Sequence, residues 1–185
     1  MWIQSCVTLA VLLSLSLSVA GQSTPARRVD VLERGTYRAD TLARTPMPGT
    51  TGVINTIQNA RLISSSTSIP GLLGVRFGLR YLLRGESAAL VPLRLVIVFP
   101  PAGLRNPTTG QTFFSSEHTV SVRAGASLYW EYSFENQWEI VPGLWQFEFW
   151  EGETKLGEQR FCVYGLGAND ASSTLPRECR SALLG

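Results

Sequence analysis

Short runs of alternating apolar and polar residues dominate the chain from Val31 onward. The clearest run covers residues 75–83, in which every second residue is apolar: Val75, Phe77, Leu79, Tyr81 and Leu83. Because strand side chains alternate between the two faces of a sheet, this run predicts a half-buried strand. Later runs repeat the pattern and predict further rows of inward side chains, namely Leu93, Leu95, Ile97 and Phe99, then Leu128, Trp130, Tyr132 and Phe134, and then Trp145, Phe147 and Phe149.

Comparable runs predict eight strands, over residues 31–38, 53–63, 72–83, 89–99, 118–123, 127–134, 144–150 and 159–164. No segment keeps an apolar period of 3.6 residues, so we expect little helix. Turn residues separate the runs, as in the Pro142-Gly143 and Gly152 segments. Seven to eight short antiparallel strands are typical of an immunoglobulin-like β-sandwich. A small β-barrel uses the same alternation and is the alternative.

The strand pattern divides the chain into four parts: residues 1–20, a flexible leader at 21–30, the sandwich at 31–165 and a C-terminal tail at 166–185. Residues 100–117 carry no clear alternation and are predicted to form an extended loop. Loops of that length in compact domains are commonly functional or mobile.

The first twenty residues have the layout of a secretory signal peptide. They contain no charged side chain, run apolar from Cys6 to Leu17, and end in Ser18-Val19-Ala20 before a polar segment. We therefore predict cleavage after Ala20 and a periplasmic or secreted protein. The competing interpretation is an uncleaved anchor, but the serine-diluted apolar stretch is short for a bilayer span. The mature chain has no other run that could span a membrane.

Two cysteines remain after residue 20, Cys162 and Cys179. In an oxidising compartment an even pair predicts a disulfide. Two independent thiols are the alternative, with Cys162 half-buried on a strand.

Charge and residue counts restrict the chemistry. A net charge of +2 does not indicate a nucleic-acid binder, whose domains are usually strongly basic. One histidine and three cysteines offer little material for a protein-built metal, iron–sulfur or haem site, so no cofactor or metal is expected.

Catalytic candidates are few. His118 is the only histidine, and a serine hydrolase would need it as general base beside a nucleophile and a carboxylate. No Gly-x-Ser-x-Gly motif accompanies it. Glu131 and Glu148 could face outward on neighbouring strands and act as a carboxylate pair of the kind used by glycosidases. A surface histidine and solvated glutamates are the more ordinary interpretations.

Binding candidates are arginines and tryptophans. Arg76, Arg80 and Arg84 share one face of a predicted strand, and Arg94 points to the same outward side of the next predicted strand. Together these arginines could form a stripe that binds an anionic partner. Trp138 lies in a loop and Trp150 points outward beside a hairpin tip. Exposed tryptophans can stack on sugars or anchor a protein partner. Ion-paired arginines and edge-covering tryptophans are the structural alternatives.

A family resemblance rests on motifs distributed over residues 35–163. They are Gly35-x-Tyr37, Ile69-Pro70, Gly74-Val75-Arg76-Phe77-Gly78, Tyr81, Phe99-Pro100-x-x-Gly103-Leu104, Pro142-Gly143-x-Trp145-x-Phe147 and Phe161-x-Val163. With these motifs the chain resembles a bacterial family of exported proteins with a domain of unknown function. The resemblance implies an immunoglobulin-like fold. It supplies no catalytic residues.

We therefore expect an exported, non-catalytic β-sandwich that serves as a binding or structural module of the cell envelope. The expected partner is an envelope protein or a polysaccharide, with Trp138, Trp150 and the 100–117 loop as the first candidate surface. The alternative is a small extracytoplasmic hydrolase that uses His118 or the Glu131/Glu148 pair. A hydrolase needs those groups to line a concave pocket, whereas a binding module needs Trp138 or Trp150 exposed.

Overall fold

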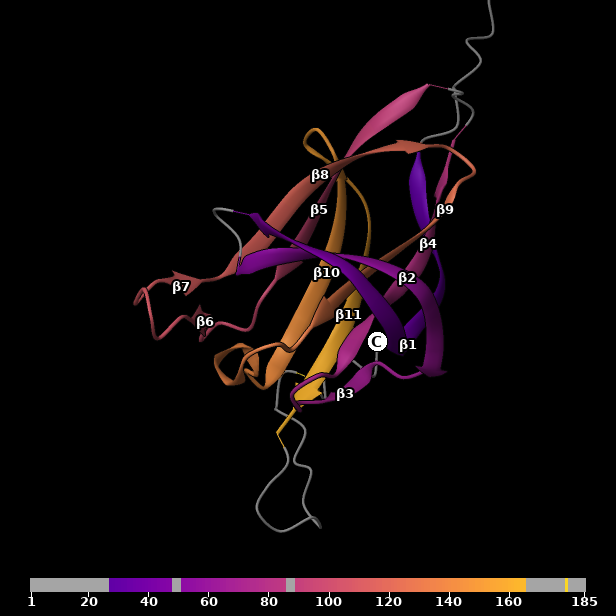
Figure 1. Cartoon of the computed structure of the whole chain (residues 1–185). Helices are drawn as coiled ribbons and strands as arrows, with labels where there is room; N and C mark the ends of the chain where they lie inside the picture. Colours follow the sequence, from indigo (N-terminus) through magenta and orange to yellow (C-terminus); the bar gives the residue numbers. More distant parts are fainter. Residues whose placement is uncertain (1–26, 48–50, 86–88, 166–178, 180–185) are drawn as a thin grey trace, which may run out of the picture.

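The fold is known from a computed structural model that describes residues 27–47, 51–85, 89–165 and 179. The predicted signal peptide, and the predicted tail apart from Cys179, lie outside the described residues. Two packed sheets and one short two-stranded sheet make up the described chain (Figure 1).

The first sheet has four strands in the order β2-β1-β4-β9, all antiparallel. Its strands are β1 (Arg28–Met47), β2 (Gly52–Ser64), β4 (Arg76–Arg84) and β9 (Ser127–Ser133). The outermost strand on one side is β9, and no described strand pairs with its outer edge.

The second sheet has five strands in the order β3-β11-β10-β5-β8. Its strands are β3 (Ser68–Pro70), β5 (Leu90–Val98), β8 (Ser115–Arg123), β10 (Gly143–Glu151) and β11 (Thr154–Tyr164). Only the β3–β11 pairing is parallel within this sheet. Neither sheet closes on itself, so the predicted sandwich is confirmed and the alternative barrel is not the fold.

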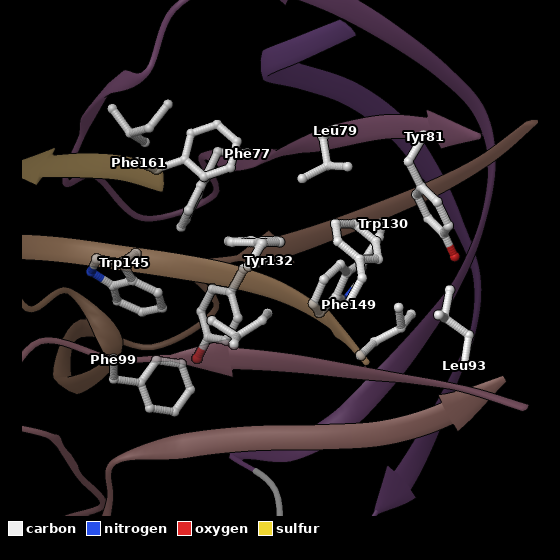
Figure 2. Close-up of a cluster of buried hydrophobic side chains, with 14 of the residues drawn as sticks. Phe77, Leu79, Tyr81, Leu93, Phe99, Trp130, Tyr132, Trp145, Phe149 and Phe161 are labelled. Atoms are coloured by element: carbon white, nitrogen blue, oxygen red, sulfur yellow. The ribbon is translucent and has the colours of Figure 1, made fainter. Parts of the chain in front are cut away.

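Aromatic rings fill the space between the two sheets (Figure 2). The ring of Phe77 lies between 5.3 and 5.7 Å from the rings of Phe134, Trp145, Phe147 and Phe161. All five side chains are inaccessible to solvent. Edge-to-face contacts of this kind add to the stabilisation from burial, so this cluster is the centre of the core.

Most predicted strands are present with small shifts in their ends, and the described residues contain little helix beyond the 3₁₀ turn η1 (Gln137–Glu139). The strand predicted at 72–83 starts later, because residues 71–75 form a turn in which the Val75 N–H donates to the Leu72 carbonyl. The predicted leader overlaps β1, which begins at Arg28.

The prediction that 100–117 is one extended loop is wrong. Residues Leu104–Arg105 and Thr112–Phe113 pair as the hairpin β6–β7, and β8 already begins at Ser115. The Asn106 side chain closes the hairpin turn by accepting the N–H groups of Thr108 and Thr109. Such side-chain-to-backbone bonds are not visible in an apolar alternation pattern.

The strand predicted at 31–38 is the largest departure, because β1 continues to Met47 and pairs with β2 as a long hairpin. Register shifts interrupt this pairing between Thr36 and Tyr37, between Arg38 and Asp40, and between Thr41 and Ala43. Irregularities of this type bend and twist a strand pair. The outer half of the hairpin, residues 40–47 and 51–58, is called the hairpin arm below.

The hairpin arm is attached to the outer side of the first sheet. The Arg76 guanidinium on β4 donates to the Thr41 hydroxyl at 2.6 Å. Beyond β9, the Asn55 side-chain amide donates to Glu135 at 2.7 Å. Held by these bonds, the arm extends past β9 to the side of the sandwich at which β9 and β8 are the edge strands.

Candidate functional site

A cavity of about 220 Å³ lies where the hairpin arm, β9 and β8 meet. β9 contributes Tyr129 to Ser133, β8 contributes Ser116 and His118, and β5 contributes Ile97. The residues of the arm that line the cavity are Thr51, Val53, Ile54, Asn55 and Ile57. The turn after β9 completes the wall. Polar side chains gather here, in contrast to the aromatic space between the sheets.

Three carboxylates line this cavity: Glu131, Glu135 and Glu139. Glu139 is only 5% exposed, and its carboxylate accepts the backbone N–H groups of Glu135 at 2.7 Å and Asn136 at 3.0 Å. The Asn136 side-chain amide adds a third donor at 2.9 Å. Glu139 is therefore satisfied by neutral donors, and no cationic side chain among the described residues pairs with it.

Glu131 lies on the outer face of β9 and pairs with the Arg76 guanidinium. Its second oxygen accepts the Tyr129 hydroxyl at 2.6 Å. Burial raises the pKa of Glu131, although Tyr129 and Arg76 both oppose that shift. Burial, reinforced by the negative charge of Glu131, raises the pKa of the Tyr129 phenol far above its usual range. The phenol thus stays protonated and keeps donating to Glu131.

Asn55 is the unusual residue of this site. Its amide nitrogen donates to Glu135, which fixes the orientation of the side chain. Its carbonyl oxygen Oδ1 is buried and accepts no hydrogen bond from the described protein. Buried polar atoms almost always have a partner, so this oxygen is an exception that carries a desolvation cost.

His118 lies on β8 and its ring faces that of Trp130, with 6.2 Å between their centroids. Burial lowers the pKa of His118, so the imidazole is neutral at neutral pH. His118 and Glu131 both line the cavity, which meets one requirement of the hydrolase alternative. However, within the described part of the chain His118 makes no hydrogen bond to a carboxylate or a serine, as a triad would require.

The predicted Glu131/Glu148 pair is wrong. β9 belongs to the first sheet and β10 to the second, so the two glutamates do not share a face. Glu148 instead accepts from the Lys155 ammonium at 2.6 Å and from the Trp150 indole at 3.0 Å. The alternation gave each residue's side of its strand correctly but could not assign strands to sheets.

Arg76, Arg80 and Arg84 do lie on one face of β4, but each is paired with an acid. Arg80 contacts Glu33 at 3.0 Å and Arg84 contacts Asp30 at 2.7 Å, in addition to the Arg76–Glu131 pair. Arg94 does not join the predicted stripe because β5 lies in the other sheet. It contacts Glu117 at 3.2 Å.

Trp138 and Trp150 are both half-buried, and neither lines the cavity. Trp138 packs against the core from η1. The Trp150 ring lies 5.3 Å from the Arg94 guanidinium and 5.2 Å from the Lys155 ammonium. Their role in binding stays a prediction.

Sequence patterns missed Asn55, Glu135 and Glu139. Asn55 and Glu135 are 80 positions apart and meet only because the hairpin arm folds over β9. The one available signal was the set of acids between Glu131 and Glu139, which looked like solvated strand and loop positions.

The predicted disulfide is present between Cys162 and Cys179, with 5.5 Å between their Cα atoms. Among the described residues no cluster of three or more His, Cys, Asp or Glu side chains could hold a metal ion. No helix within the described ranges is long and apolar enough to cross a membrane.

The two open sheets and their aromatic core define an immunoglobulin-like β-sandwich. Residues 26–163 match the family described as "Domain of unknown function (DUF3859)", and the chain belongs to that family. This confirms the resemblance found in the sequence motifs.

Among solved structures, the chain is similar to an immunoglobulin-like protein from Pseudomonas aeruginosa. The identity is 25%, the TM-score is 0.54, and the alignment covers 76% of this chain and 98% of that one. An alkylpurine DNA glycosylase, AlkC, from Pseudomonas fluorescens bound to abasic-site DNA matches at 19% identity and a TM-score of 0.35. That alignment covers 54% of this chain and 28% of the glycosylase. No curated protein matches the chain.

Proposed function

We propose that this protein is an exported, non-catalytic binding module of the cell envelope, and that the cavity beneath the hairpin arm is its ligand site. The observation that carries the proposal is the cavity itself, which has a volume of about 220 Å³ and is lined by polar side chains from the hairpin arm, β9 and β8.

The size of the cavity suits a small ligand or one side chain of a larger partner. A cavity of roughly 150 Å³ accepts benzene, and drug-sized ligands occupy roughly 300–1,000 Å³. At about 220 Å³ this cavity falls between the two. The envelope partner proposed from the sequence, a protein or a polysaccharide, would therefore insert a single group.

Export is supported by the uncharged apolar segment before Ala20 and by the Cys162–Cys179 disulfide. Disulfides persist in oxidising compartments, which include the bacterial periplasm. The test is expression of the full chain in a bacterium, followed by fractionation and intact-mass measurement. The expected product is a periplasmic or secreted chain beginning at Gly21. A cytoplasmic chain that retains residues 1–20 would contradict export.

A hydrolase is the second candidate, and the observation that favours it is the presence of His118 and Glu131 in one cavity. Against it, the carboxylate of Glu131 is occupied by Arg76 and Tyr129. Replacement of His118 by Ala tests the hydrolase. Retention of the biological phenotype in that variant would exclude a hydrolase that uses His118 as its base, because such an enzyme would lose its activity.

The binding site is tested by filling the cavity from β9. Ser133 lines the cavity, and Ser127 is an exposed serine on the same strand that does not. Ser133→Phe should block the cavity, and Ser127→Phe is the matched control. Thermal unfolding is measured with a panel of small amines, sugars, carboxylates and phosphates. At least one class should raise the Tm of wild type and Ser127→Phe but not of Ser133→Phe. If no class distinguishes these variants, the cavity is not a ligand site.

A further inference from the structure

We propose that the β1–β2 hairpin docks on the surface of an anionic phospholipid membrane through Arg34, Arg38 and Arg61. These three arginines are called the arginine patch below. The inference goes beyond the proposed ligand site, because none of the three lines the cavity. It rests on a comparison of two arginine pairs within the molecule, on the open position of β2 in its sheet and on apolar side chains beside the patch.

The first arginine pair is neutralised within the chain. Arg28 on β1 is the register partner of Arg84 on β4. Like charges directly opposite one another destabilise a sheet, but Asp30 bridges this pair and contacts Arg28 at 3.0 Å and Arg84 at 2.7 Å. Hydrogen bonds from Arg84 and then from Arg28 hold the pKa of Asp30 below its ordinary value. The carboxylate therefore stays ionised and compensates the two guanidinium charges.

The second arginine pair has no such carboxylate. Arg38 on β1 is the register partner of Arg61 on β2, so the two side chains share one face of adjacent strands (Figure 1). Both are exposed, and among the described residues neither forms an ion pair. Asp40 lies two residues along β1 but accepts from the Asn59 side-chain amide at 2.8 Å instead. An external anion placed between Arg38 and Arg61 would do for this pair what Asp30 does for the first.

Arg34 extends the arginine patch along β1. Arg34 to Tyr37 pair with β4, and Tyr37 and Arg38 pair with β2, each without a register shift. Arg34 and Arg38 therefore lie on the same face of β1, about 13 Å apart along the strand. Arg34 is exposed and forms no ion pair within the described part of the chain. β2 is the outermost strand of its sheet, so no described strand pairs beyond Arg61.

An anionic membrane suits this open patch better than a small soluble anion does. A single exposed ion pair is weak, because water and salt screen it. A membrane surface presents many anionic phosphates at once, so the three arginines can be engaged together. Each arginine close to such a surface strengthens binding about fivefold. Guanidinium groups also match the geometry of phosphate oxygens.

Apolar side chains beside the arginines favour lipid over a purely polar polyanion. Ile63 follows Arg61 by two residues on β2 and is 61% exposed, and Leu32 precedes Arg34 by two residues on β1 and is 49% exposed. Binding at a membrane interface increases with the apolar area that enters it as well as with the attraction between basic residues and anionic lipids. The hairpin offers both contributions.

The first experiment measures binding of the full-length protein to phospholipid vesicles by co-sedimentation. The probes are vesicles of phosphatidylglycerol and phosphatidylcholine in equal parts, and vesicles of phosphatidylcholine alone. At about 50 mM salt the anionic vesicles should bind at least about tenfold more tightly than the neutral ones, and the difference should shrink at about 300 mM salt. Equal binding of the two kinds of vesicle would overturn the inference.

The second experiment compares the two arginine pairs. One double variant carries Arg38→Gln and Arg61→Gln, and its matched control carries Arg28→Gln and Arg84→Gln. Both lose the same net charge and keep residues 1–20, so any contribution of that segment cancels. The first should bind anionic vesicles about thirtyfold more weakly than wild type, and the control should bind like wild type. Equal losses in the two variants would show a general effect of net charge and refute docking at the arginine patch.

A charge reversal separates docking from loss of folding. Arg61→Glu places a carboxylate opposite Arg38, so it should raise the Tm while it removes the preference for anionic vesicles, because opposite charges across a strand pair stabilise a sheet. A Tm below that of wild type would contradict the uncompensated charge on which the inference rests.

The last comparison tests other sources of the anion. Inorganic phosphate and poly-glutamate are titrated into wild type and into the variant with Arg38→Gln and Arg61→Gln, and binding is followed by calorimetry. Both probes should bind wild type more weakly than anionic vesicles do. Tighter binding of phosphate would indicate a soluble ion as the ligand, and tighter binding of poly-glutamate would indicate an acidic protein. Either result, if lost in the double variant, would overturn docking on lipid and leave the cavity, which Ser133→Phe tests, unaffected.

Discussion

The interior between the sheets and the cavity beneath the hairpin arm are both lined with aromatic rings, yet they differ in every polar respect. Around Phe77 the space is filled by rings from both sheets, and the one indole N–H of Trp145 is satisfied by the Val141 carbonyl at 3.0 Å. Around Asn55 the space is open, three carboxylates line it, and one buried acceptor has no protein donor.

The difference shows which region serves stability and which is available for binding. A fully packed region gains free energy from burial and has no room for a ligand. The cavity forgoes that gain and keeps polar groups desolvated, which is a cost that natural proteins usually accept at functional sites. Substitutions in the two regions should therefore have distinct consequences.

The largest effect is expected at the packed region. Phe77→Ala should lower the free energy of unfolding by about 3–5 kcal/mol, because it leaves a cavity amid four other rings. Urea unfolding measures the change, with exposed Leu73→Ala as a control that should shift stability by less than about 0.5 kcal/mol. A loss below about 1 kcal/mol at Phe77 would show that this cluster is not the centre of the core.

The disulfide is expected to rank next. Replacing Cys162 and Cys179 together by Ala should cost about 3 kcal/mol, because the bond closes a loop with a sequence separation of 17. Urea unfolding of the wild type in the presence of reductant should approach the curve of the double variant. Stability that is identical with and without the bond would argue against the predicted contribution.

At the cavity edge, breaking the Arg76–Glu131 pair is expected to lower the free energy of unfolding by less than breaking a fully buried ion pair would. The two side chains are 14% and 9% exposed, so Arg76→Met should cost about 2 kcal/mol, below the roughly 3–5 kcal/mol of complete burial. The cost arises because Glu131 is left without its cation. Adding Glu131→Gln should restore most of the loss in urea unfolding. A double variant no more stable than Arg76→Met would contradict this.

The smallest expected effect is a dependence of stability on pH that comes from His118 in the cavity wall. Burial lowers the pKa of His118 below its ordinary value of 6.5. Below pH 6.5 the unfolded chain therefore binds a proton that the native chain does not, and stability falls as the pH drops through the folded pKa. Stability should be flat with respect to this group above pH 6.5.

His118 is the only histidine, which makes the effect easy to isolate. His118→Gln should remove this part of the pH dependence, as measured by thermal unfolding between pH 5 and 7.5. A variant whose curve parallels the wild type throughout would show that His118 does not titrate differently in the folded state.

The two regions also differ in how far sequence could predict them. The core followed from period-two alternation, which placed residues such as Phe77, Trp130 and Trp145 inward because alternation is a local property of one strand. Assignment of strands to sheets is not local, which is why the Glu131/Glu148 pair and the extension of the arginine stripe to Arg94 were wrong.

The cavity could not be predicted from the sequence, because it is formed by the long hairpin of β1 and β2, whose contacts join residues far apart in the chain. β1 runs far beyond its predicted end, and its pairing with β2 is interrupted by register shifts that no apolar pattern encodes. Asn55 therefore looked like an ordinary strand residue in the sequence. Its role emerges only when the hairpin arm brings it to Glu135.

The most direct test of the cavity as a ligand site is a crystal structure of the protein with the panel compound that raises its Tm most. The compound should lie beneath the hairpin arm, in contact with the residues of the arm, β9 and β8 that line the cavity. A compound bound elsewhere, for example against the Trp150 ring, would contradict the assignment of this cavity as the ligand site.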